Sequence, residues 1–112
     1  MVDPRWTNSI DVAITVCDRD GVIMAMNDSS KELFAEDGGA DLIGTNLFGC
    51  HSPESAEGIR GLIRDGASNT YTVEKHGVRK LIHQTPWYDN GTIAGLVELS
   101  IVLPASLPHH VR

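Results

Sequence analysis

Cys50 and His51 stand side by side in the sequence, immediately before a serine and a proline. Thiol and imidazole groups are the side chains most used for metals, haem and nucleophilic catalysis. A metal site is poorly supported here, because adjacent side chains rarely reach one ion and no second cluster of ligands is visible. A structural interpretation also stays open, in which Cys50 is a small apolar residue in a turn before a helix.

The residues after this pair predict a helix over 53–65. Ser52 supplies a hydroxyl N-cap, Pro53 suits the first helical position and Glu54 places an acid in the first turn. A glycine directly after Asp65 ends the helical pattern. Because a helix N-terminus favours negative charge, the preceding turn is expected to suit an anion or a carbonyl-bearing ligand, or to hold a redox-sensitive thiol.

Length, composition and charge restrict the possible classes of protein. A chain of 112 residues forms one domain with a single core. Its net charge of −6 argues against binding to nucleic acid or an anionic membrane, which requires clustered lysine and arginine. No apolar run approaches the roughly 20 residues that cross a bilayer, and the first residues lack the pattern of a signal peptide. Two cysteines without a CxxC spacing fit a reducing compartment, so we expect a cytoplasmic protein.

Turn signals divide the chain into two strands, a helical middle region and three further strands. Loops ending in Gly21, Gly77 and Gly91 separate runs of β-branched and apolar residues and predict hairpins, whose strands are antiparallel. In the middle region, Ser29 and Glu32 have the spacing of a capping box and predict the start of a short helix. The predicted strands cover residues 12–17, 22–27, 70–75, 78–88 and 92–103.

This order of elements resembles that of a PAS domain. CDRDGVIMAMN at 17–27 is similar to the D-x-x-G-x-I-x-x-x-N opening of PAS sensors, and LIGTNLF at 42–48 to their "iG" stretch. TPWYDNGTIAGLVELSI at 85–101 is similar to their closing hairpin. GTNLFGCHSPES at 44–55 further resembles PAS modules that have a Cys-His-Pro-like turn before the long helix.

The resemblance covers residues 11–103, with 1–10 as an N-terminal cap segment and 104–112 as a C-terminal tail. It implies an α+β fold in which short helices lie on one face of a five-stranded antiparallel sheet. It does not fix a function, because one fold serves many purposes.

The resemblance also lets the known cofactor sites of the family be compared with this sequence. Flavin-binding light sensors place their reactive cysteine three residues after the "iG" glycine, a position that Leu47 occupies here, whereas Cys50 lies six residues after Gly44. Oxygen-sensing haem members use a histidine inside the long helix, and residues 53–65 contain none. The sequence therefore argues against a flavin adduct and against a helix-histidine haem, and it leaves the cofactor unknown.

Strand alternation divides the predicted sheet into an apolar face and a polar face. From the residues alone, the apolar face would pack on the helices. Aligned on Pro86 and Gly95, the resemblance implies the reverse, so that polar side chains face the helices and line a pocket. The implied ligand-binding residues are Thr15, Cys17, Cys50, His51, Gln84, Glu98 and Ser100.

The apolar face would then point away from the helices, with Tyr71 and Val73 on it. An apolar patch of this size does not stay exposed in a soluble monomer, so we expect a homodimer. The residues near Trp6 could cover only part of this face. The expected interface residues are Ile14, Val16, Leu81, His83, Trp87, Val97, Leu99 and Ile101.

Three hypotheses for the function follow. In the first, the chain is a sensory or regulatory module that binds a small polar ligand and signals to a downstream protein through its sheet face. In the second, it is an interaction or dimerisation module without a ligand. In the third, which is the least supported, an enzyme uses Cys50 as nucleophile and His51 or His83 as base, although neighbouring residues seldom provide that geometry. We therefore expect no enzymatic activity.

Overall fold

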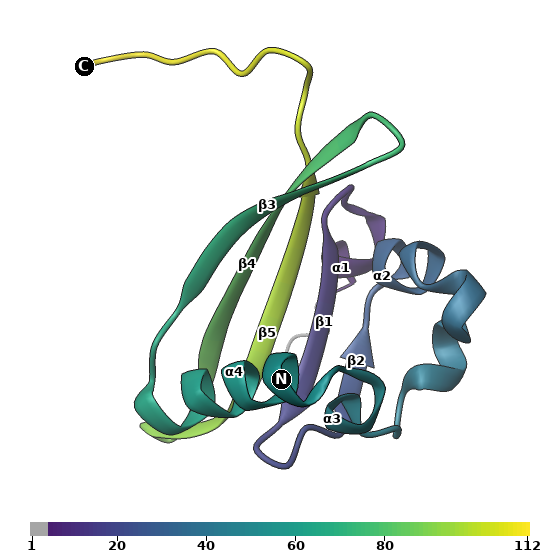
Figure 1. The fold of residues 1–112 in the computed structure, drawn as a ribbon, viewed down its shortest axis with the longest axis vertical. Helices are drawn as coiled ribbons and strands as arrows, with labels where there is room; N and C mark the ends of the chain where they lie inside the picture. Colours follow the sequence, from purple (N-terminus) through teal and green to yellow (C-terminus); the bar gives the residue numbers. More distant parts are fainter. Residues whose placement is uncertain (1–4) are drawn as a thin grey trace.

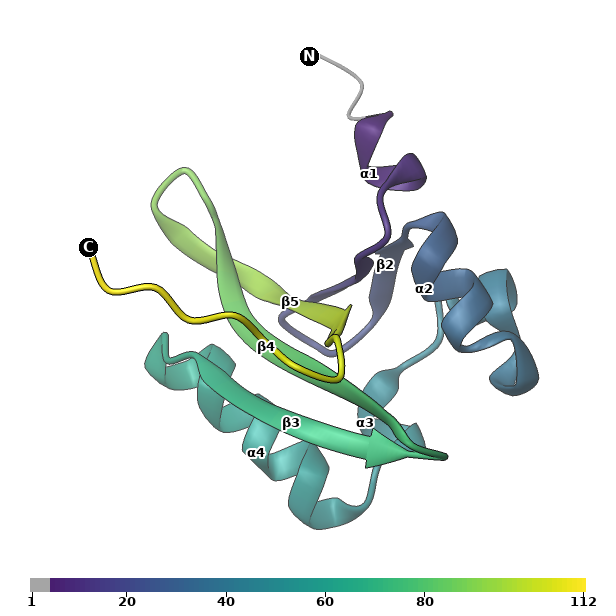
Figure 2. The same ribbon diagram turned by 90° about the horizontal axis from the view of Figure 1, so that it is seen from above.

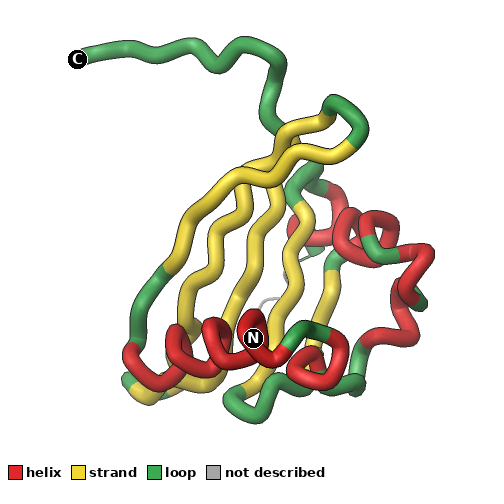
Figure 3. The backbone as a smooth tube through the Cα atoms, in the orientation of Figure 1, coloured by secondary structure: helices red, strands yellow, loops and turns green. Residues whose placement is uncertain are grey.

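Five strands form one antiparallel sheet in the computed structural model, which describes residues 5–112 except for the side chain of Cys50 (Figure 1; Figure 3). The strand order is β2-β1-β5-β4-β3, so the first strand lies beside the last. The predicted α+β fold with a five-stranded antiparallel sheet is therefore confirmed. The strands are β1 (Ala13–Asp18), β2 (Ile23–Met26), β3 (Asn69–Lys75), β4 (Val78–Asp89) and β5 (Thr92–Val102).

Two-residue turns join the last three strands, as their sequences predict. His76 and Gly77 connect β3 to β4 with φ angles of 52° and 77°, and Asn90 and Gly91 connect β4 to β5 with φ angles of 51° and 79°. Two consecutive left-handed residues match the twist of a hairpin, and glycine in the second position avoids the steric cost.

The helices between β2 and β3 lie on one side of the sheet. The long helix crosses β4 and β5, whereas the first helix after β2 packs against β1 and β2 (Figure 1). A further short helix before β1 packs against that first helix. In chain order the elements are α1 (Trp6–Ser9), α2 (Asp28–Leu33), the 3-10 turns η1 (Ala35–Asp37) and η2 (Gly39–Leu42), α3 (Leu47–Cys50) and α4 (Pro53–Asp65).

The long helix α4 has the bounds that its sequence predicts. The Ser52 hydroxyl accepts a hydrogen bond from the Ser55 N–H at 3.2 Å, and Gly66 ends the helix in a left-handed conformation. Ala56, Ile59 and Ile63 are buried on the face that contacts the sheet. Because the cap, the stop and the apolar face are all local signals, this helix could be predicted without tertiary information.

The start of α2 differs from the prediction that Ser29 opens it. The N-cap is Asn27, whose Oδ1 accepts a hydrogen bond from the Ser30 N–H at 3.0 Å. Ser29 instead lies inside the helix and donates its hydroxyl hydrogen to the Ile10 carbonyl at 2.8 Å. The capping-box prediction is wrong because Asn27 also accepts a hydrogen bond from the Ile14 N–H of β1, a tertiary contact that fixes it at the helix start.

The register of the sheet determines which side chains face the helices. Glu98 of β5 pairs with Thr15 on one side and with Gln84 on the other, and all three side chains point toward the helices. Tyr71 and Val73 share this face, because the two-residue turn pairs Tyr71 with Ile82. The sequence predicted Tyr71 and Val73 on the apolar face, together with the odd-numbered residues of β4. That prediction is wrong, because a two-residue turn pairs each odd-numbered residue of β3 with an even-numbered residue of β4.

Candidate functional site

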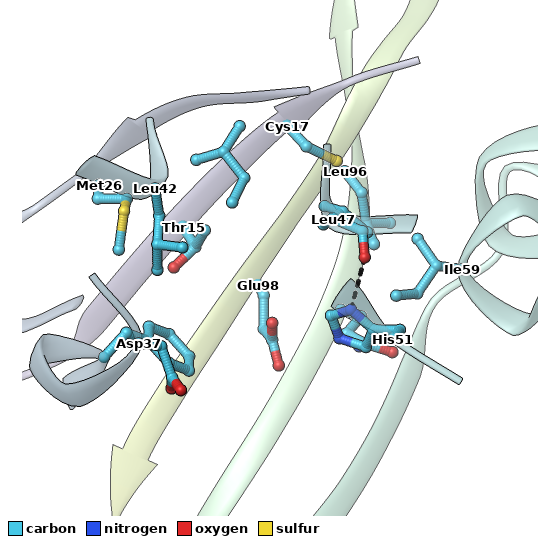
Figure 4. Close-up of a pocket in the computed structure, with 13 residues that line it drawn as sticks. Thr15, Cys17, Met26, Asp37, Leu42, Leu47, His51, Ile59, Leu96 and Glu98 are labelled. Atoms are coloured by element: carbon cyan, nitrogen blue, oxygen red, sulfur yellow. Dashed lines mark hydrogen bonds between the residues drawn. The ribbon is translucent and has the colours of Figure 1, made fainter. Parts of the chain in front are cut away.

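A cavity of about 480 Å³ lies between the helices and the sheet (Figure 4). Its walls come from β1, β2, the segment from α2 to α4, and the centres of β4 and β5. Volumes of this size are typical of small-molecule sites. The apolar lining residues are Cys17, Ile23, Met26, Phe34, Leu42, Leu47, Ile59 and Leu96, and the polar ones are Thr15, Asp37, His51, Gln84 and Glu98.

The floor of the cavity is part of the hydrophobic core. Cys17 and Leu96 are directly paired on β1 and β5, and Ile59 of α4 packs over them. Cys17 is 3% exposed, and burial raises the pKa of its thiol above the ordinary value. At neutral pH this thiol is therefore uncharged and acts as an apolar wall rather than as a nucleophile.

Glu98 is the carboxylate that extends from the middle of the sheet into this cavity (Figure 4). Loss of contact with water raises the pKa of the Glu98 carboxyl, and the nearby His51 acts in the opposite direction. Among the side chains that the structure describes, none donates a hydrogen bond to this carboxylate. Glu98 is thus a largely buried ionisable group whose charge is not compensated by a direct partner.

Two further polar side chains that line the cavity, Thr15 and Gln84, have partners within the protein. The hydroxyls of Thr15 and Ser30 form a hydrogen bond at 2.5 Å. The Gln84 amide oxygen accepts a long hydrogen bond of 3.5 Å from Asn69. These pairs fix the walls that surround Glu98.

His51 lines the cavity from the turn between α3 and α4. Its Nδ1 lies 2.7 Å from the Leu47 carbonyl oxygen (Figure 4), and because a carbonyl can only accept, Nδ1 must carry the hydrogen. This bond sets the orientation of the ring and leaves Nε2 as the atom available to a ligand.

A second cavity, of about 220 Å³, adjoins the first on the side of β3 and β4. Thr15, Phe34 and Glu98 line both spaces, so Glu98 stands where they meet. The smaller space also includes Tyr71 and Lys80. Burial raises the pKa of the Tyr71 hydroxyl, and the negative charge of Glu98 adds to the shift.

The structure brings most of the predicted ligand-binding residues together. Thr15, Cys17, His51, Gln84 and Glu98 line the larger cavity, and Ser100 lines the smaller one. The Cys50 side chain lies outside the described part of the structure. Among the described side chains, no three histidine, cysteine, aspartate or glutamate residues come close enough to hold a metal ion.

Sequence reasoning missed Asp37 and Phe34, which also line the larger cavity. Both lie in or beside the 3-10 turn η1, a short irregular segment without a periodic signal. Lys80, which lines the smaller cavity, was also missed.

The face of the sheet that points away from the helices contains all eight predicted interface residues. His83 of β4 bonds through Nδ1 to the Thr70 hydroxyl at 2.7 Å. Its position on this face separates it from α3, so His83 does not serve as a base for Cys50. Each of the eight is half-buried: Ile14, Val16, Leu81, His83, Trp87, Val97, Leu99 and Ile101.

Trp87 on this outer face is tied to the strand that forms the cavity floor. Its indole Nε1 donates a hydrogen bond to the Cys17 carbonyl oxygen at 3.0 Å. Gly95 pairs with Trp87 on β4 and with Asp18, the residue after Cys17, on β1, and a Cβ at Gly95 would collide with the Cys17 backbone. Glycine is therefore required where β5 closely approaches β1.

The short helix α1 leaves the outer face uncovered within the described residues. It stands beside α2 and projects away from β3 and β4 (Figure 2). Trp6 is 64% exposed, so it is not packed against the sheet. After β5 the chain continues as an extended segment that runs away from the helices (Figure 1). In residues 5–112 no helix has the length and apolar character needed to cross a membrane.

Comparison with known proteins agrees with this architecture. The family model described as "PAS fold" matches residues 7–104. VqmA from Vibrio cholerae, solved as a dimer, aligns with a TM-score of 0.70 and 21% identity over 88% of this chain and 48% of VqmA, so the chain spans about half of VqmA. Comparison with curated proteins finds no match.

Two further structures from Vibrio cholerae are similar to this chain. The Aer2 receptor, described as a dual PAS-haem oxygen sensor, has a TM-score of 0.64 and 15% identity over 83% of this chain and 95% of its own. A sensory box sensor histidine kinase has a TM-score of 0.63 and 18% identity over 89% of this chain and 88% of its own. Identities this low show a shared fold and do not identify a ligand.

Proposed function

The chain belongs to the PAS family, and we propose that it is a sensory module that binds a small molecule in the cavity between its helices and its sheet. Proteins with this fold include a sensor kinase and an oxygen sensor. VqmA, which is similar in fold, has been solved bound to DPO. These neighbours support a sensory role, while the cavity itself supports the ligand.

The observation that carries the proposal is the combination of an apolar cavity of about 480 Å³ with the uncompensated carboxylate of Glu98 inside it. A protein that used this fold only as an interaction surface would gain stability from filling the space with side chains. It would also gain by replacing Glu98 with an apolar residue, because burial of an unpaired charge is costly. A ligand that fills the cavity removes both costs.

The residues proposed to contact the ligand are those that line the two cavities. Thr15, Cys17, His51, Gln84 and Glu98 surround the larger space, and Ser100 belongs to the smaller one. Cys50 is included because it precedes His51 in the chain. His51 Nε2 and the Glu98 carboxylate provide the directional contacts, whereas the aliphatic residues exclude water.

The proposed output surface is the apolar outer face of the sheet, through which two copies of the chain associate. A stable interface buries about 800 Å² on each partner, and apolar burial contributes about 25 cal/mol per Å² before the costs of association. Large aromatic residues dominate such interfaces, so Trp87 is the expected anchor. A change in this association, or the binding of a downstream protein to the same face, would report occupancy of the cavity.

Native mass spectrometry of freshly purified protein tests the ligand proposal. We expect a mass above that of the chain which disappears under denaturing conditions. In the variant Leu42→Trp, an indole would occupy the cavity, so the additional mass should be lost. The matched control Ile43→Trp adds the same side chain at the next residue, which is exposed and does not line the cavity, and should retain it.

Two results would contradict the proposal. One is a wild-type protein that carries no additional mass and whose thermal stability no member of a small-molecule library increases. The other is a bound molecule that Leu42→Trp and Ile43→Trp retain equally, because such a molecule would lie outside the cavity. The first result would favour an interaction module without a ligand.

A further inference from the structure

We infer that the ligand is a small organic cation, in which an amine that pairs with Glu98 is attached to an apolar body that fills the larger cavity. This inference rests on the proposed function, since it assigns the chemistry of the ligand in the same cavity. It departs from the anion or carbonyl ligand that the α4 N-terminus suggests, because Ser52 at that terminus is exposed and does not line the cavity.

The position of Glu98 makes it the group that a ligand must satisfy. It stands at the junction of the two cavities on the central strand β5, so a molecule in either space passes next to it. Its nearest strand neighbours inside the cavity are Thr15, which is already bonded to Ser30, and Gln84. A carboxylate in apolar surroundings requires a donor, and a cation gives the shortest and strongest bonds to it.

The protein provides few cations of its own near this carboxylate. No lysine or arginine lines the larger cavity among the described residues, where the ionisable groups besides Glu98 are Asp37, His51 and Cys17. His51 is the only possible cation of the three, whereas Asp37 adds a second negative charge. Negative groups therefore outnumber positive ones, and an anionic ligand would meet repulsion.

The smaller cavity contains the remaining ionisable groups that face Glu98. Lys80 of β4 and Tyr71 of β3 line it. Lys80 forms no ion pair with Glu98 and lies on the opposite side of the junction from the larger cavity. It therefore favours an acidic or hydroxyl group only in a ligand long enough to extend past Glu98, and it leaves the charge preference of the larger cavity unchanged.

The apolar side chains of the larger cavity determine the chemistry of the part of the ligand that carries the amine. The apolar residues that line the same cavity as Glu98 include Phe34, Leu47, Leu96, Met26 and Ile59. These side chains offer no hydrogen-bonding groups, so the body of the ligand must be a hydrocarbon or an aromatic ring. A compact polyamine would leave this surface in contact with water and is therefore excluded by the same argument.

Three indole compounds with side chains of similar size but different charge provide the test. Tryptamine is a cation, tryptophol is neutral and indole-3-acetate is an anion. Each is titrated at pH 7.5 into the full chain labelled with ¹⁵N, and binding is read from the amide resonances of cavity residues. We expect tryptamine to bind at least tenfold more tightly than the other two, because it alone places a positive charge against the Glu98 carboxylate.

The variants Glu98→Gln and Glu36→Gln separate direct pairing from net charge. Glu98→Gln keeps the shape and should reduce tryptamine affinity about tenfold or more while leaving tryptophol within twofold. Glu36→Gln removes one negative charge from an exposed position that does not line the cavity and should leave tryptamine within twofold. Tryptamine affinity should also fall as the pH is lowered, because protonated Glu98 no longer attracts a cation.

The outcomes distinguish the two proposals. If tryptophol or indole-3-acetate binds as tightly as tryptamine, or if Glu98→Gln does not remove the preference, the cation assignment is overturned while a ligand cavity remains supported. If none of the three perturbs cavity resonances at millimolar concentration and the protein carries no molecule in native mass spectrometry, the proposed function fails, and the cation assignment fails with it.

Discussion

Replacement of Asn27 by alanine should cost far more stability than the loss of an ordinary helix cap. The side chain is 5% exposed and makes four hydrogen bonds. Its Oδ1 accepts from the Ile14 N–H at 2.8 Å and from the Ser30 N–H at 3.0 Å. Its Nδ2 donates to the carbonyls of Thr7 at 2.6 Å and Val12 at 2.7 Å. One amide thus joins α1, β1 and α2.

The expected loss in the free energy of unfolding follows from these four hydrogen bonds. Loss of the cap to Ser30 costs about 1 kcal/mol, and each further hydrogen bond contributes about 1 kcal/mol net. Water can reach part of the exposed α1, so the carbonyl of Thr7 is partly compensated in the variant. We therefore expect Asn27→Ala to lower the free energy of unfolding by about 3–4 kcal/mol, a large part of the 5–15 kcal/mol typical of a domain.

Urea denaturation followed by circular dichroism measures this loss. Asn27→Ser is the matched control, because serine can still cap α2 but cannot reach both carbonyls. We expect the free energy of unfolding of Asn27→Ser to be about 1 kcal/mol higher than that of Asn27→Ala, and still below that of the wild type. A cost below about 1.5 kcal/mol for Asn27→Ala would show that the bonds to Thr7, Val12 and Ile14 contribute nothing, and this account of how α1 is held would be wrong.

Three further predictions concern α4, the cavity and the outer face. Ser52→Ala should lower the free energy of unfolding by about 1 kcal/mol in urea titrations, because the Ser55 N–H loses its acceptor; an unchanged midpoint would contradict this. Burial raises the pKa of the Glu98 carboxyl, so ionisation of Glu98 opposes folding. The free energy of unfolding is therefore highest below the ordinary carboxyl pKa, and it falls as the pH rises from there through the raised pKa. In protein freed of any bound ligand, Glu98→Gln should therefore raise the melting temperature at pH 8 but not at pH 4, and equal changes at both would refute the assignment. Leu99→Asp should give a monomer or an insoluble protein in analytical ultracentrifugation, whereas a wild type that is already monomeric at high micromolar concentration would refute the dimer.

The elements that could be predicted from the sequence are those with local causes. The bounds of α4 follow from Ser52, Pro53 and the glycine after Asp65, and the hairpin turns follow from glycine at residues that need a positive φ. The resemblance to the PAS family added the orientation of the sheet. It placed Gln84 and Glu98 toward the helices, opposite to what hydrophobic patterning alone indicates.

The elements that could not be predicted depend on contacts between distant parts of the chain. Asn27 caps α2 because β1 and α1 lie next to it, and no local signal distinguishes it from the nearby serines. Asp37 reaches the cavity from a 3-10 turn without periodicity. The face of Tyr71 depends on the number of residues in a turn, where an error of one reverses every side chain of β3.

The central strands give a physical reason why a cavity and an outer face of this sheet should respond together. Glu98 points toward the helices, while its neighbours Val97 and Leu99 point the other way. Cys17 connects the cavity with the outer face of the sheet. Its side chain lines the cavity, and its carbonyl oxygen accepts the hydrogen bond from Trp87 on the outer face. A ligand that displaces Cys17 therefore also displaces the acceptor that orients the largest side chain of the outer face. Packed interiors deform little and transmit strain, so such a displacement would reach the outer face beside Gly95, where the Cys17 backbone leaves no room for a Cβ.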